Sequence, residues 1–165
     1  MSDAPLVLIT SPDPHQEESA DTIIRKHVTF AMAGGLIPVP LLDLAAVTAV
    51  QLDMLKQLAQ EYGAPFDSGS ARSFVTSLTS TLAGSVLARV GASMVKAIPG
   101  IGTVLGGITQ VVTTGASTYA VGNLFRRVFR EKRPIESLNV ETVKAEAAAY
   151  YEKGVELAKS LARKV

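Results

Sequence analysis

Apolar side chains along this chain recur at the three- and four-residue spacing that places them on one face of a helix. Proline or glycine closes most of these periodic stretches, as is usual at helix ends. No stretch of any length alternates with the two-residue period of a strand. The sequence therefore predicts an all-α fold, with helices over about 19–34, 41–62, 71–98, 103–130 and 137–163.

Two Ile-Pro corners divide the predicted helices into pairs. Ile37-Pro38 separates the first helix from the second, and Ile98-Pro99 separates the third from the fourth. Proline has no N–H and restricts the residue before it, so each corner interrupts a helix. We expect two apolar helical hairpins and a C-terminal amphipathic helix. The expected organisation is a flexible leader 1–18 and a single helical domain 19–165, with hairpins 19–62 and 70–130 and the terminal helix 137–163.

Small residues recur at every fourth position of the third predicted helix. They are Ser80, Gly84, Ala88 and Ala92. Small residues at this spacing form a stripe that lets two helix backbones approach closely, an arrangement favoured in lipid and in crowded bundles. We predict that this helix-packing stripe lies against a second helix.

Charged residues are distributed unevenly. They make up 19% of the 165 residues, with a net charge of +1, yet residues 73–125 contain only Arg89 and Lys96. Surface helices in water carry charge on their outer faces, so we expect part of this stretch to contact something else. One alternative is a membrane, although glycine, serine and threonine make the uncharged run 97–125 a marginal span. The other is burial against copies of the chain.

A cluster of cations directly follows the uncharged stretch. It consists of Arg126, Arg127, Arg130, Lys132 and Arg133. Cations beside an apolar helix are typical of contact with anionic lipid headgroups or an acidic partner. They also suit a solvated helix end, where positive charge complements the helix dipole. The sequence leaves both interpretations open.

Residues that could carry catalysis are scarce. The chain has no cysteine, and His15 and His27 lack a second ligand at metal-binding spacing. Gly100-Ile-Gly102 resembles a phosphate-binding loop only superficially, because a helix rather than a strand precedes it. The near-zero net charge and 5% aromatic content give no basis for nucleic-acid binding. We therefore expect no catalytic residue, no cofactor, no metal and no enzymatic activity.

Asp43 lies among apolar neighbours, between Leu42 and Leu44. An isolated buried carboxylate is costly, so its charge must be stabilised. In one interpretation Asp43 lies in the first turn of the second helix and complements the helix dipole. In the other it forms a buried ion pair with Arg89 or Lys96 of the second hairpin.

Several motifs taken together resemble a bacterial family known as domain of unknown function 697. The segments concerned are Gly35–Asp43, Gln51–Leu55, Tyr62-Gly63, Ala97–Thr103 and Gly115–Ala120, within about residues 20–130. The resemblance implies an accessory domain that is membrane-associated and is sometimes fused to, or encoded beside, a Ras-like GTPase. It implies no catalytic residues.

Pattern and resemblance together predict a non-enzymatic, membrane-associated accessory protein. We expect a homo-oligomer at the inner face of, or inserted in, the bacterial cytoplasmic membrane, with a Ras-like GTPase as partner. The alternative is a soluble helical homo-oligomeric scaffold that buries its uncharged helices against copies of itself.

The two interpretations of Asp43 predict different losses of stability. If Asp43 complements a helix terminus, Asp43→Asn lowers the free energy of unfolding by about 0.3–1 kcal/mol. If it neutralises Arg89 or Lys96, the loss is about 3–5 kcal/mol because a buried cation is left unpaired. Chemical denaturation of the two proteins measures the difference.

Overall fold

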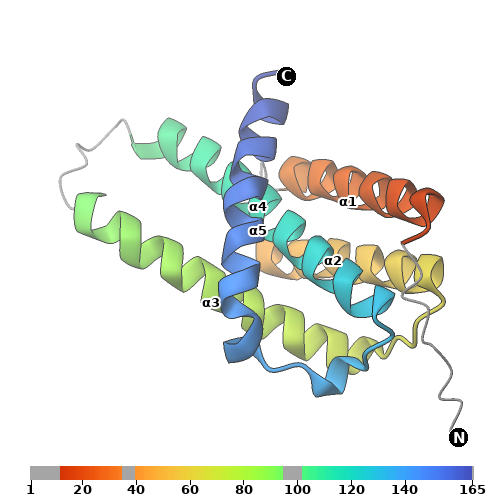
Figure 1. The fold of residues 1–165 in the computed structure, drawn as a ribbon. Helices are drawn as coiled ribbons and strands as arrows, with labels where there is room; N and C mark the ends of the chain where they lie inside the picture. Colours follow the sequence, from red (N-terminus) through yellow and green to blue (C-terminus); the bar gives the residue numbers. More distant parts are fainter. Residues whose placement is uncertain (1–11, 35–39, 95–101, 165) are drawn as a thin grey trace, which may run out of the picture.

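A computed structural model describes residues 12–34, 40–94 and 102–164, with the helix backbone alone for 40–44, 83, 85–94 and 102–109. In chain order the helices are α1 (Pro14–Gly34), α2 (Pro40–Tyr62), α3 (Ser68–Met94), α4 (Gly102–Arg130) and α5 (Val140–Ala162), with a 3-10 turn at Ile135–Ser137 before α5 (Figure 1). These residues include no strand, which confirms the all-α prediction. Both Ile-Pro corners lie outside the described residues.

Helix α1 begins at Pro14, five residues before the predicted start at Ser19. The Asp13 carboxylate accepts a hydrogen bond from the backbone N–H of His15 (2.9 Å), and the Asp13 carbonyl accepts one from Glu17 (3.0 Å). Proline suits the first helical position because an N–H there would have no partner within the helix. Residues 14–18, predicted to belong to the leader, are therefore part of the helical body.

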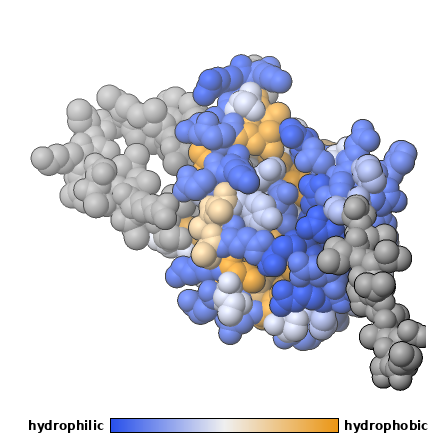
Figure 2. Space-filling model, viewed as in Figure 1, coloured by the Kyte–Doolittle hydropathy of each residue, from blue (hydrophilic) through white to orange (hydrophobic). Residues whose placement is uncertain are grey.

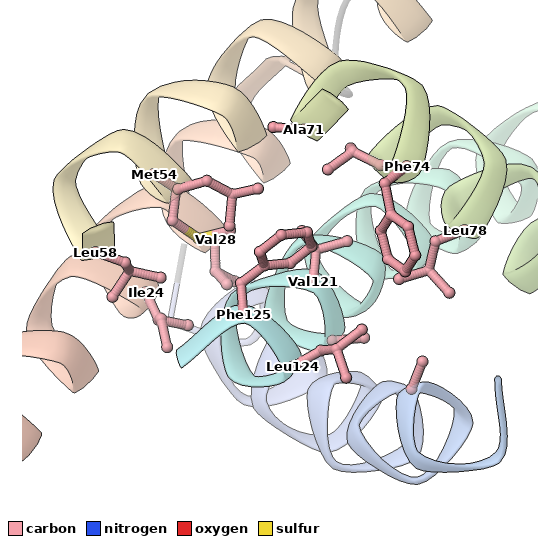
Figure 3. Packing of buried hydrophobic residues seen from close by; sticks show 14 of the residues in the cluster. Ile24, Val28, Met54, Leu58, Ala71, Phe74, Leu78, Val121, Leu124 and Phe125 are labelled. Carbon is pink, nitrogen blue, oxygen red and sulfur yellow. The ribbon is translucent and has the colours of Figure 1, made fainter. Parts of the chain in front are cut away.

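Helix α4 is the central helix of the fold. It packs against α1, α2 and α5, and more lightly against α3 (Figure 1). Val121, Leu124 and Phe125 have no exposed surface, and the rings of Phe125 and Phe74 meet edge to face at 5.6 Å (Figure 3). A helix with neighbours all round cannot carry charge. The described end of the uncharged stretch, from Val111 to Phe125, is thus largely accounted for by burial within the chain.

The two expected hairpins are packed to different degrees. Helices α1 and α2 lie against each other along their lengths, whereas α3 and α4 share few contacts. The C-terminal part of α3 and the N-terminal part of α4 extend past the other helices on the same side (Figure 1). We call residues 83–94 and 102–109 of these two helices the arm. Helix α5 crosses both α4 and α3 where the arm leaves the body.

Glycine lets α4 and α5 approach each other closely. A Cβ on Gly154 of α5 would lie 2.9 Å from the Cα and the carbonyl oxygen of Ala116 in α4. On α4 itself, a Cβ on Gly115 would meet Met32 at 2.8 Å, and one on Gly122 would meet Ile24 at 2.9 Å. Real Cβ atoms do not approach other atoms so closely. At Gly154 the neighbour is backbone, so glycine is required there, whereas a Cβ at Gly115 or Gly122 would displace a side chain.

The predicted helix-packing stripe does not show this behaviour where the structure describes it. Ser80 is exposed, and a Cβ on Gly84 would meet nothing within 4 Å. The side chains of Ala88 and Ala92 lie outside the described part of the chain. Within the described residues, Gly84 therefore makes no close contact with another helix. Packing of the stripe against a second helix stays a prediction. A small-residue contact forms instead between Gly154 and Ala116.

Alanine at two helical glycines should have opposite effects on stability. Gly154→Ala places a methyl group against the α4 backbone, which cannot move aside as a flexible side chain would. We expect the free energy of unfolding to fall by about 1–3 kcal/mol. Gly84→Ala meets nothing and should raise it by up to about 1 kcal/mol through helix propensity. Equal effects in urea denaturation would contradict the close contact between α4 and α5.

Candidate functional site

The beginning of α1, the end of α2 and the last turns of α4 converge on one carboxylate, that of Glu17. Arg126 of α4 donates to Glu17 Oε2 through Nε (2.9 Å) and Nη2 (2.5 Å), and Nη2 also donates to the Glu17 carbonyl (3.1 Å). Tyr62, the last residue of α2, donates its hydroxyl to Glu17 Oε1 (2.9 Å). Arg130 makes a longer contact with the same oxygen (3.4 Å). One side chain thus connects three helices.

Partial burial makes these contacts stronger than a surface ion pair. The side chains of Arg126 and Glu17 are 19% and 22% exposed. Burial raises the pKa of Glu17, but the hydrogen bonds from Tyr62 and Arg126 outweigh it and hold the pKa below its ordinary value. Burial, followed by the hydrogen bond to Glu17, raises the pKa of the Tyr62 hydroxyl. Glu17 is therefore ionised and Tyr62 neutral at physiological pH.

The remaining cations of the basic cluster also have partners within the chain. Arg127 lies 2.5 Å from Glu146 of α5 and 3.7 Å from Glu131, while Arg133 lies 3.7 Å from Glu131. The Arg127 Nε is enclosed and has no hydrogen-bond partner among the described residues.

Lys132 joins the ends of two helices. Its ammonium donates to the carbonyl oxygen of Tyr62 at the end of α2. Helices α2 and α4 end in turns of the same type, in which a residue with left-handed backbone follows the helix. This residue is Gly63 (φ 56°) after α2 and Lys132 (φ 55°) after α4. The backbone N–H of the next residue donates to the carbonyl oxygen five residues earlier. These bonds join Ala64 to Ala59 and Arg133 to Val128.

The structure thus brings together all five cations that the sequence predicted as a lipid or acidic-partner contact. It supplies an acidic partner, Glu17, that the sequence does not predict, because the pattern places Glu17 in the leader. Asp13 followed by Pro14 and then Gln16 is an N-terminal helix signal that could have placed Glu17 in the first turn of α1. The side chains of Asp43, Arg89 and Lys96 lie outside the described residues.

A second polar contact joins α1 to α2. His27 is 3% exposed, with Nδ1 2.7 Å from the Ile23 carbonyl oxygen and Nε2 3.0 Å from Asp53 Oδ2. Gln57 donates to the same Asp53 oxygen at 2.8 Å. The hydrogen bond with His27 lowers the pKa of Asp53 despite some desolvation. His27 thus forms an interhelical contact, and no group of three potential metal ligands occurs among the described side chains.

Comparison with known proteins identifies the family. A family profile described as "Domain of unknown function (DUF697)" matches residues 11–156. The chain belongs to this family. The matched region of this DUF697 member includes Glu17, the basic cluster and most of α5.

A relative extends the comparison over nearly the whole chain. It is "Magnetosome membrane protein 22" of Magnetospirillum gryphiswaldense, 35% identical over 165 residues that cover 99% of the DUF697 chain and 83% of the relative. No solved structure matches the chain. Within the residues that the structure describes, no helix combines the length and apolar character needed to cross a membrane.

Removing the Glu17 charge should weaken the junction of the three helices. Glu17→Gln removes the nearer of the two carboxylates that pair with the partly buried Arg126, the other being Asp21 at 4.0 Å. We expect the free energy of unfolding at pH 7 to fall by about 1–3 kcal/mol, between the values for exposed and buried pairs. The neighbouring Glu18→Gln, at an exposed position, should change it by less than about 0.5 kcal/mol. Thermal and urea denaturation of both variants provide the measurement.

The same pair of variants gives a pH test. Because the folded-state pKa of Glu17 lies below its ordinary 4.5, its stabilising contribution is present above pH 4.5 and is lost as the pH falls through the folded pKa. Glu17→Gln should therefore show a smaller loss of stability than the wild type on acidification below pH 4.5. An unchanged pH dependence would show that Glu17 does not interact as described.

Proposed function

We propose that this DUF697 protein is a non-enzymatic, membrane-associated accessory protein of a bacterial cell, which contacts the inner face of the cytoplasmic membrane through its arm. The name of the 35%-identical relative describes a membrane protein, and the identity extends over 99% of this chain. A likeness of this extent supports a shared cellular setting. The fold indicates which part of the chain contacts the membrane.

The observation that carries the proposal is that the charge-poor stretch 73–125 divides into two parts. Its C-terminal part forms the core of the bundle, where Ala116, Val121 and Phe125 have no exposed surface. The helices of the arm extend past that core (Figure 1), and the sequence from 83 to 109 contains Arg89 and Lys96 but no carboxylate. We infer that the apolar sequence of the arm is what a membrane would bury.

The surface of the body differs from the arm in composition. Hydrophilic residues cover most of the described face in Figure 2, with narrow apolar areas between them. Its basic cluster is engaged with Glu17, Glu131 and Glu146. The arm has one cation, Arg89, and no acid, and Lys96 lies between its two parts in the sequence. The arm is therefore better suited to anionic lipid, where each cation near the surface contributes about 1 kcal/mol.

The soluble homo-oligomer is the second candidate, because mutual contact of several arms would bury the same surface. A Ras-like GTPase partner remains a proposal that rests on the family resemblance. The vesicle experiment below separates membrane contact from self-association.

Two acidic substitutions in the arm should weaken vesicle binding. A carboxylate in the apolar part of a bilayer costs about 3 kcal/mol, so Leu87→Glu with Leu105→Glu should lower affinity for anionic phospholipid vesicles at least tenfold. The control carries the same added charge at exposed body positions, Ala49→Glu with Ala149→Glu. Flotation of vesicles of neutral phospholipid, with and without anionic phospholipid, gives the affinities.

Two results would contradict membrane contact through the arm. One is a wild-type protein that fails to float with either vesicle type and has the mass of one defined oligomer without detergent, a result that favours the soluble scaffold. The other is equal loss of binding in the arm variant and the body control, which would show a general effect of negative charge.

A further inference from the structure

A pocket of about 180 Å³ opens beside the Glu17 junction. It is lined by Glu17, Asn123, Arg126, Arg127, Arg130 and Tyr150, from α1, α4 and α5. The volume is far above the roughly 10–15 Å³ that one water molecule requires on the same measure. Three guanidinium groups thus surround a space large enough for a small anion.

The charges around the pocket are not balanced. The ion pairs of the described residues around the pocket form two groups. Arg25, Arg126 and Arg130 pair with Glu17 and Asp21, and Arg127 and Arg133 pair with Glu131 and Glu146, so five arginines share four carboxylates. Lys132 adds a further cation, whose ammonium contacts a backbone carbonyl. This excess of positive charge disfavours a metal cation and favours an anion.

Two of the pocket arginines have unused hydrogen-bonding capacity. Arg130 reaches Glu17 only at 3.4 Å, and its side chain is 40% exposed. The Arg127 Nε also has no partner among the described residues, but it is enclosed, so a ligand reaches it only when the side chain shifts. Guanidinium groups bind oxyanions through pairs of parallel N–H bonds.

We propose that this arginine pocket binds a phosphate group. A phosphate offers several acceptor oxygens and more than one negative charge, which suits convergent guanidinium groups better than a carboxylate does. The carboxylate of Glu17 already occupies one side of Arg126, and the phosphate binds on the side of Arg127 and Arg130. The phosphate belongs either to a soluble phosphomonoester or to a lipid headgroup.

The phosphate pocket and the arm are separate surfaces of the molecule. Leu105 of the arm and Arg127 of the pocket are 22 residues apart on α4, or roughly 33 Å along the helix axis at 1.5 Å per residue. This separation exceeds the screening length of roughly 8–10 Å at physiological salt. Failure of one proposal therefore leaves the other intact.

The test measures binding of inorganic phosphate to the full chain by isothermal titration calorimetry, at pH 7 and constant ionic strength in chloride. We expect saturable binding of one phosphate per chain. Arg130→Gln should weaken it about tenfold or more, as loss of a charged hydrogen bond does. The matched control is Arg133→Gln, because Arg133 is equally exposed (42%) but does not line the pocket. It should change the affinity less than twofold.

Two further ligands identify the source of the phosphate. Glycerol phosphate represents a soluble phosphomonoester, and phosphatidic acid in neutral phospholipid vesicles represents a headgroup. If Arg130→Gln lowers the affinity for glycerol phosphate tenfold and leaves the affinity for the vesicles unchanged, the ligand is a soluble phosphomonoester. If it lowers the affinity for the vesicles tenfold as well, the ligand is a headgroup. Absence of saturable phosphate binding by the wild type, or equal losses in Arg130→Gln and Arg133→Gln with both variants folded by circular dichroism, would overturn the proposal.

Discussion

The burial of α4 on nearly all sides is the constraint on which the rest of the fold depends. A helix surrounded by α1, α2 and α5 has no solvated face for charge. It also needs small residues where its neighbours pack closely against it. Gly115 and Gly122 meet the second requirement at a cost of up to about 1 kcal/mol each in helix propensity. Close packing against Met32 and Ile24 offsets that cost. The absence of charge from the buried part of α4 and the glycines at positions 115 and 122 therefore have a common cause.

The charges reappear where α4 leaves the core, and there they join the helices to one another. Arg126 connects α4 to α1, and Arg127 connects it to α5. Because these pairs are partly buried, each charge depends on its partner for compensation. The junction thus determines how α1, α2 and α5 meet the end of the central helix, while it also creates a positively charged pocket on the surface.

Local signals made much of the fold predictable. The end of α2 at Tyr62 agrees with the sequence because Gly63 follows it, and the bounds of α4 also agree with the predicted ones. The start of α1 was placed too late because proline and acidic residues together suggested a leader. The cations were found but their partners were not, since Arg126 and Glu17 are 109 residues apart in sequence. Spacing likewise revealed small residues without revealing which helix would lie opposite them.

The turn at Lys132 has a consequence for how this region opens. Left-handed backbone costs a residue other than glycine roughly 1–2 kcal/mol, and Gly63 occupies the equivalent turn at the end of α2 without that cost. At position 132, glycine would relieve the strain but could not supply the ammonium group that binds the Tyr62 carbonyl. The end of α2 therefore depends on the turn after α4, because fraying of α4 removes the Lys132 ammonium from the Tyr62 carbonyl.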